Sequence, residues 1–264
     1  MLVFYYILLG VFSMGNINYD FIHKEEGGVK NKDGVIDHNL GYWPGGISGL
    51  TIAKGIDLSY FSEQDLKDAG VLEKDIAQVR DIPGANLGYI KKKTKGPNWR
   101  WVRGAHGSAI ATAGNIYDSK ITVNGKNVGY KVEWSDTSTK AMQKWVQERF
   151  TKSAEDTYNK IVKDKSLKFN DLTKDQQTVL YSITYNAGEN FIEDVSKDLK
   201  KAIENNDWIA IEKELMSKDK WLTNKDRRFR EGDYLRKERL KRQKKEDTSF
   251  FFPDNGLMPK DIPV

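Results

Sequence analysis

The chain has 264 residues, a formal net charge of +5 and a pI near 9.0. Its hydrophobic content of 38% and charged content of 31% are typical of a globular protein with a substantial core. Cysteine is absent, which excludes a disulfide framework, a thiolate zinc site and a cysteine nucleophile. The basic balance favours an anionic partner: nucleic acid, a membrane surface or an acidic cell wall.

The chain begins with an apolar segment. Residues 2–12 are apolar or aromatic apart from one glycine, a run too short to span a bilayer but of the length of a signal-peptide core. Small residues for cleavage follow at Ser13 and Gly15, although no basic residue precedes Lys24. We expect residues 1–15 to be an export signal or anchor, and therefore a secreted or periplasmic protein. Translation from Met14 is the alternative.

The next segment predicts a helix followed by turns. Ile17, Phe21 and Ile22 have helical spacing, Asn16 or Asn18 is suited to cap the helix, and the glycine pair after Glu26 is suited to end it. Residues 28–50 are rich in Gly, Asn and Asp, which favours turns and short strands.

A strand and a short helix are expected next. Thr51, Ile52, Ile56 and Leu58 predict one strand, interrupted by Gly55. A glycine inside a strand indicates a bulge or a close approach to the backbone. Ser62 is then expected to cap a helix that runs through Asp68 and is closed by Gly70.

The remainder predicts an insertion and then a helical region. Residues 91–134 are expected to form an inserted loop with a hairpin across Asn124-Gly125. Helical patterns cover roughly 137–163, 173–187, 196–204, 207–217 and 224–246, and residues 247–264 are expected to be a tail. The predicted fold is α+β, with a small sheet lobe and a larger helical lobe in one domain of residues 16–246.

Two carboxylates and a hydroxyl suggest glycosidic chemistry. Cleaving a glycosidic bond requires a protonated acid for the leaving oxygen and a second, ionised carboxylate. Glu26 at a helix end and Asp57 after a strand are suited to these roles, with the Thr51 hydroxyl holding a water. Each residue also has an ordinary structural interpretation: a solvated helix end for Glu26, a capping acid for Asp57 and a β-branched strand residue for Thr51.

Four segments occur in the order in which phage-type lysozymes carry similar ones: "FIHKEEGG", "SGLTIAKGIDL", "LTKDQQTVLYSITYNAGENF" and "RRFREGDYL". The second resembles most closely the pesticin-like branch of bacterial toxins, in which an Asp follows the Thr by six residues. The resemblance covers about residues 19–240. It implies a lysozyme-like fold with a catalytic groove and no cofactor or metal.

The resemblance also implies an activity and residue roles. The activity is a muramidase that cuts peptidoglycan with inversion. Glu26 matches the general acid, Asp57 the carboxylate that activates water and Thr51 the hydroxyl that positions this water. Asn186 matches an amide that binds the sugar, and Arg227 or Arg228 matches an arginine that pairs with the catalytic Glu.

Two departures from the family leave alternatives open. Phage lysozymes place the second carboxylate between the Glu and the Thr, where this chain has Asp33 and Asp37. Asp33 is therefore a rival to Asp57. In addition, Ala53 and Lys54 replace the usual glycine and a small or aromatic residue, and we expect Lys54 to face solvent.

The basic segment near the C-terminus has competing interpretations. Residues 226–247 contain ten Lys and Arg against six Asp and Glu. We interpret this run as a solvated helix face with ion pairs rather than a nucleic-acid site. The expected partners are peptidoglycan and, for the toxin branch, a cognate immunity protein, with the chain a monomer. A non-catalytic peptidoglycan-binding protein and a lytic transglycosylase are the alternative functions.

Overall fold

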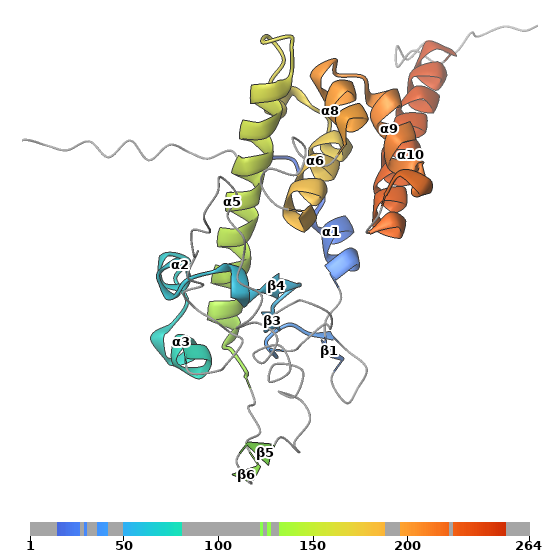
Figure 1. Cartoon of the computed structure of the whole chain (residues 1–264). Helices are drawn as coiled ribbons and strands as arrows, with labels where there is room; N and C mark the ends of the chain where they lie inside the picture. Colours follow the sequence, from blue (N-terminus) through green and yellow to red (C-terminus); the bar gives the residue numbers. More distant parts are fainter. Residues whose placement is uncertain are drawn as a thin grey trace, which may run out of the picture. The chain divides into compact units, whose positions relative to one another are not determined.

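The structure is a computed structural model with α+β secondary structure (Figure 1). It describes residues 15–26, 29–30, 36–41, 50–80, 122–123, 126–127, 132–187, 196–221 and 224–251. Only the backbone is described at some element ends, including Glu25 and Glu26. The chain divides into two compact units: residues 19–149 form the first unit, and residues up to 18 together with those from 150 onward form the second.

Helices make up most of the described chain. They are α1 (Tyr19–Glu26), α2 (Glu63–Asp68), α3 (Glu73–Arg80), α5 (Asp136–Ile161), α6 (Lys174–Ala187), α8 (Lys197–Glu204), α9 (Trp208–Met216) and α10 (Lys225–Phe251), with single 3-10 turns at η1 (Leu58–Tyr60), η2 (Phe169–Asp171) and η3 (Lys218–Lys220). The five helices predicted after residue 135 are confirmed, as are those ending at Glu26 and Asp68. Helix α3 was not predicted.

The predicted start of the tail is wrong. Helix α10 continues to Phe251, beyond the expected end at residue 246. No glycine or proline interrupts residues 247–251, and the first proline after them is Pro253.

The strands form three two-stranded antiparallel pairs in the described ranges. These are β1 (Val29–Lys30) with β2 (Ile36–Asp37), β3 (Thr51–Ile52) with β4 (Ile56–Asp57), and β5 (Thr122–Val123) with β6 (Lys126–Asn127). The pairing of Val123 with Lys126 confirms the predicted hairpin. The apolar N-terminus up to residue 14 and most of the predicted insertion lie outside the described residues.

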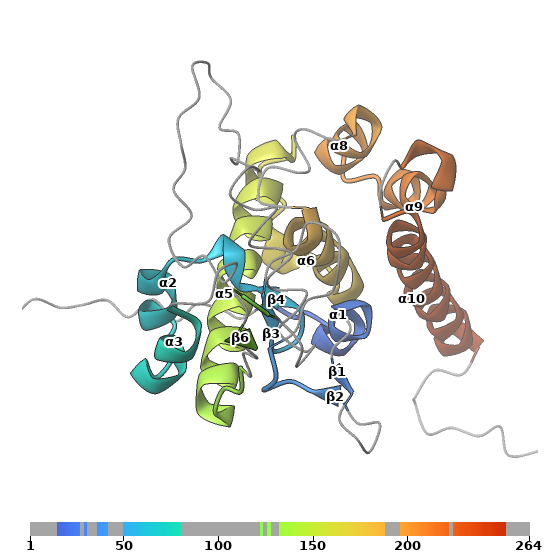
Figure 2. The same cartoon turned by 60° about the horizontal axis from the view of Figure 1, so that its bottom comes forward.

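The first unit packs its two short helices beside the start of α5 (Figure 2). Ser62 caps α2 through a capping box with Asp65, and Gly70 follows with a φ of +83°, as the sequence predicted. Buried Asp75 of α3 accepts hydrogen bonds from the hydroxyls of Ser135 and Ser138, at 2.6 and 2.7 Å. These bonds satisfy the buried carboxylate and fix α3 against the N-terminus of α5.

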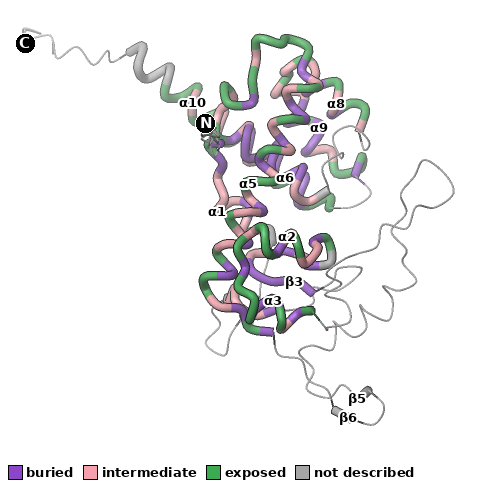
Figure 3. Tube along the Cα trace, turned by 90° about the vertical axis from the view of Figure 1, so that its left-hand side faces the viewer, coloured by how far each residue is buried: buried purple, intermediate pink, exposed green. Residues whose placement is uncertain are grey.

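The second unit has a continuous apolar core from five helices. Residues of α5, α6, α8, α9 and α10 contribute buried side chains, among them Tyr158, Leu180, Ile203, Leu215 and Leu235. Figure 3 shows the buried face of α6 in this unit. Helix α10 lies against α9 so closely that a Cβ at Gly232 would stand 2.9 Å from the Glu212 carbonyl oxygen. No described helix is apolar over enough length to cross a membrane.

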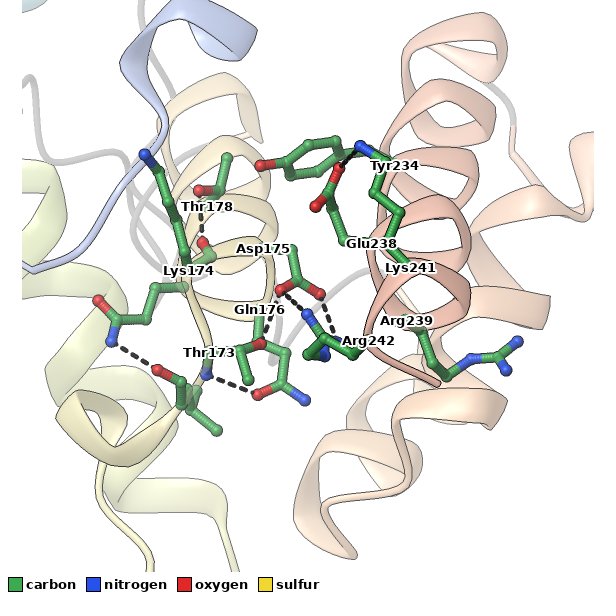
Figure 4. A network of polar contacts seen from close by, with 12 residues as sticks. Thr173, Lys174, Asp175, Gln176, Thr178, Tyr234, Glu238, Arg239, Lys241 and Arg242 are labelled. Atoms are coloured by element: carbon green, nitrogen blue, oxygen red, sulfur yellow. Dashed lines mark hydrogen bonds and ion pairs between the residues drawn. The ribbon is translucent and has the colours of Figure 1, made fainter. Parts of the chain in front are cut away.

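The second unit also includes the residues just before α1. The backbone nitrogens of Asn16 and Asn18 donate to the Gln177 and Thr178 side chains of α6, at 2.7 and 2.8 Å. The Asn18 amide nitrogen donates to the Tyr234 hydroxyl of α10 at 3.0 Å. Figure 4 shows Tyr234 extending from α10 toward Thr178. Asn16 and Asn18, which precede α1, are therefore attached to helices that lie far along the chain.

Candidate functional site

Thr51 and Asp57 stand directly opposite one another in the β3–β4 hairpin, residues 51–57. Partner residues of an antiparallel pair carry their side chains on the same face, with Cβ atoms roughly 4.5–5.5 Å apart. Thr51 is 2% exposed, whereas Asp57 is half-buried. The hairpin thus places a sheltered hydroxyl beside a carboxylate that solvent reaches.

The prediction of one strand through residues 51–58 is wrong. The chain reverses between Ile52 and Ile56, which pair with each other. Ala53 and Gly55 have φ values of 53° and 85°, the left-handed region that favours glycine. The reversal therefore accounts for Gly55 through its backbone conformation. The six-residue spacing of Thr51 and Asp57 is what a reversal of this length requires.

Glu26 is the last residue of α1 and belongs to the same unit as the hairpin. Its side chain lies outside the described residues, so its protonation and its distance from Asp57 stay predictions. Asp33 also lies outside them. Asp37 of β2 is described, and its Oδ1 accepts a hydrogen bond from the Asn39 backbone at 2.9 Å, which gives this carboxylate a local structural role.

His23 connects three elements of the first unit. Lys54 Nζ, in the turn of the hairpin, lies 2.9 Å from His23 Nδ1. The side chains of Gln143 and Gln147 on α5 approach His23 Nε2 at 3.0 and 3.4 Å. Tyr19 stacks on the same ring with centroids 6.2 Å apart. Lys54 is half-buried, and the expectation that it faces solvent is wrong.

Burial first, and then the positive charge of Lys54, lower the pKa of His23 from 6.5 to about 4. Asp20 acts in the opposite direction, and His38 adds a smaller lowering effect. The ring is consequently neutral near neutral pH. The sequence interpretation missed this residue, although its position one helical turn before Glu26 was a usable signal.

Asn186 and Arg228, both predicted to bind substrate, meet in the second unit. Asn186 Oδ1 accepts from Arg228 Nη2 at 2.7 Å and from the Asn224 amide at 3.0 Å. Because both bonds end on the oxygen, the orientation of the half-buried Asn186 amide is fixed. The Arg228 guanidinium also lies over the ring of Trp221, 5.8 Å from its centroid.

Both candidate arginines pair with Glu231, which the sequence interpretation did not identify. Arg227 Nε lies 3.3 Å from Glu231 Oε1, and Arg228 Nη1 contacts Glu231 Oε2. Ser182 donates to Glu231 and accepts from Arg227, at 2.5 and 3.1 Å. We call these residues and Asn186 the arginine cluster. The spacing of Glu231 three and four residues after the arginines was the available signal.

Glu231 is fully buried and is contacted by two guanidinium groups, those of Arg227 and Arg228. Arg228 also joins this carboxylate to Asn186. The predicted pairing of one arginine with Glu26 remains a prediction, because the side chain of Glu26 is outside the described residues.

Three further basic residues of α10, Arg239, Lys241 and Arg242, form ion pairs, as expected for this segment. Arg242 makes two bonds to buried Asp175 of α6, at 2.5 and 3.1 Å (Figure 4). Arg239 binds both carboxylate oxygens of Glu212 on α9, each at 3.1 Å. Lys241 pairs with Glu238 on the helix surface. Part of the basic character of α10 therefore attaches this helix to its neighbours.

Comparison with known proteins identifies no relative: the sequence matches no protein-family model and no curated protein. Within the described ranges, no three His, Asp or Glu residues are grouped in a way that holds a metal ion. The described side chains at these positions offer a carboxylate opposite a hydroxyl in the hairpin, and an amide and guanidinium groups in the second unit.

Proposed function

We propose that the protein is a muramidase of lysozyme-like fold, which hydrolyses the β-1,4 bond between N-acetylmuramic acid and N-acetylglucosamine in peptidoglycan. The observation that carries the proposal is the direct pairing of Thr51 with Asp57 in the same unit as Glu26. Two carboxylates and a water-positioning hydroxyl are the minimal set for inverting hydrolysis.

In this mechanism Glu26 protonates the leaving oxygen of the glycosidic bond. Asp57 removes a proton from a water that attacks the opposite face of the sugar, and the Thr51 hydroxyl holds this water. The burial of Thr51 supports its role, because a sheltered hydroxyl orients one water better than a solvated one does. The half-buried position of Asp57 leaves room for the water to enter.

Sugar binding is assigned to Asn186, because an amide pairs with hydroxyl or acetamido groups of aminosugars. Arg228, the second residue expected at the substrate, orients this amide through its bond to Asn186 Oδ1. A secreted or periplasmic monomer, with a cognate immunity protein as a further partner, is the setting that fits this activity. No cofactor is required.

The test is loss of turbidity of peptidoglycan sacculi with wild type, Glu26→Gln and Asp57→Asn, followed by mass spectrometry of the released ends. Asp68→Asn is the matched control, because Asp68 is an exposed carboxylate in the same unit. Reducing muramic-acid ends that disappear in both site variants, but not in the control, are expected.

Three other results would contradict the proposal in different ways. Activity that survives Asp57→Asn would show that another residue is the second carboxylate. Asp33→Asn is then the next variant. Anhydro ends indicate a transglycosylase, which needs only one carboxylate. Binding to sacculi without release of any fragment, by folded wild-type protein, indicates a binding protein.

A further inference from the structure

The bond between Lys54 and His23 joins the two elements that carry the proposed catalytic groups. Lys54 occupies the centre of the hairpin turn, three residues after Thr51 and three before Asp57. His23 precedes Glu26 by three residues, just under one turn of α1. The 2.9 Å contact between Lys54 and His23 is thus a link from the hairpin to the helix.

The chemistry of the contact fixes the state of the ring. A lysine ammonium has only donors, so His23 Nδ1 must accept. The ring is then neutral with its proton on Nε2, and Nε2 donates to α5. The atom of Gln143 placed 3.0 Å from that nitrogen is its amide nitrogen. For Nε2 to donate, the amide is turned by 180°, which exchanges its nitrogen and oxygen and is assigned from the hydrogen-bond network.

We propose that His23 is a positioning residue for the hydrolysis: its neutral ring, held between Lys54 and Gln143, fixes the β3–β4 hairpin against α1 and so sets the separation of Asp57 and Glu26. This inference rests on the proposed function. Inverting hydrolysis depends on that separation, because a water must fit between the second carboxylate and the sugar.

The surroundings of the ring support this role. Of the charged or titratable groups that influence His23, Asp20 is on its own helix, Lys54 is in the hairpin turn and His38 follows β2. Lys54 and His38 disfavour a charged ring and Asp20 favours it. Burial, the largest cause, also disfavours the charged ring. A charged ring would lose the Lys54 bond and face an ammonium across 2.9 Å.

The first test is independent of activity. Long-range ¹⁵N NMR of wild-type protein at about pH 6 reports the protonation and tautomer of a histidine. We expect a neutral His23 ring with the proton on Nε2, and a higher pKa for the ring in Lys54→Met. A ring that is protonated under these conditions, or that carries its proton on Nδ1, overturns the proposal.

The second test is kinetic, on a soluble peptidoglycan fragment. Lys54→Met and His23→Leu are expected to lower kcat roughly 10- to 100-fold with KM nearly unchanged, because a misplacement of about 1 Å has effects of this size. His23→Gln, which keeps an acceptor for Lys54, should retain most of kcat. The double variant Lys54→Met/His23→Leu should be no slower than the slower single variant.

The control is Lys67→Met, which removes an exposed lysine of the same unit that pairs with Glu63; its kcat should match wild type. A wild-type kcat in Lys54→Met, or a rise in KM alone, overturns the positioning role. Failure of the proposed function is recognised separately, because wild-type protein would then release no fragments, or Glu26→Gln would remain active. The NMR result decides the state of His23 in either case.

Discussion

The β3–β4 hairpin and the arginine cluster place their polar groups by opposite means. The hairpin has two residues in each strand and positions Thr51 and Asp57 through backbone pairing and a tight turn. The arginine cluster holds buried charges between two long helices, α6 and α10, through side-chain bonds. We therefore expect changes in the hairpin to affect catalysis more than stability, and changes in the cluster to do the reverse.

The largest expected effect is the loss of Glu231. Glu231→Ala leaves the buried guanidinium of Arg228 without its charged partner, and breaking a buried pair in this way costs about 3–5 kcal/mol. Urea unfolding followed by circular dichroism measures this loss. Glu238→Ala, on the partly exposed surface of the same helix, is the control and should change stability by no more than about 1 kcal/mol. Equal losses of unfolding free energy in Glu231→Ala and Glu238→Ala would contradict the expected stabilising role of the arginine cluster.

A smaller effect is expected from the charge state of His23. Its folded-state pKa of about 4 lies below its ordinary 6.5, so the unfolded chain binds the proton more readily. Stability from the neutral ring is full above about pH 6.5 and decreases as pH falls toward 4. After discounting for solvent screening, we expect a loss on the order of 1–2 kcal/mol.

The measurement for His23 is the urea midpoint at several pH values across this window, for wild type and His23→Gln. The variant cannot take up a proton at this position, so its stability should decrease less between pH 6.5 and 4. Parallel pH profiles for the two proteins would mean that folding does not lower the pKa of His23.

The smallest expected effect on stability concerns two glycines of the first unit. Gly55 and Gly70 have nearly equal φ values, 85° and 83°, and alanine in this region costs about 1 kcal/mol. The space around Gly70 admits a methyl group, since the nearest atom, Ala141 Cβ, is 3.9 Å away. Both Gly→Ala variants should unfold at similarly lowered urea concentrations.

Activity is expected to separate the two glycine variants. Gly55→Ala disturbs the turn that sets Thr51 opposite Asp57, and its kcat should fall, whereas Gly70→Ala should keep the wild-type kcat. An equal kcat for both variants would show that the hairpin turn does not control the site.

Much of the helical structure was predictable, because it depends on local signals. The apolar periodicity of α5, α6, α8, α9 and α10 and the capping residue Ser62 both act over a few residues. The hairpin was mistaken for one strand because β-forming residues flank Gly55 on both sides, and a reversal leaves the same composition as a bulge. The structure shows the reversal through the pairing of Ile52 with Ile56.

The polar contacts were less predictable, since they join residues distant in sequence. The partner of His23 is 31 residues away at Lys54, and that of Ser182 is 49 residues away at Glu231. Residue type alone assigned Lys54 to solvent, because most lone lysines are exposed. Only the folded chain brings Lys54 to an imidazole acceptor.

The attachment of Asn18 to α6 and α10 has a consequence for biosynthesis. The first unit is one continuous stretch, residues 19–149, whereas the second joins the residues up to 18 with those after 149. Asn18 and Tyr234 are 216 positions apart. During translation the first unit can fold as soon as it leaves the ribosome, since domains form as units from the N-terminal side. The contacts of Asn16 and Asn18 form only after α6 and α10 have been synthesised, so the second unit is completed after the first.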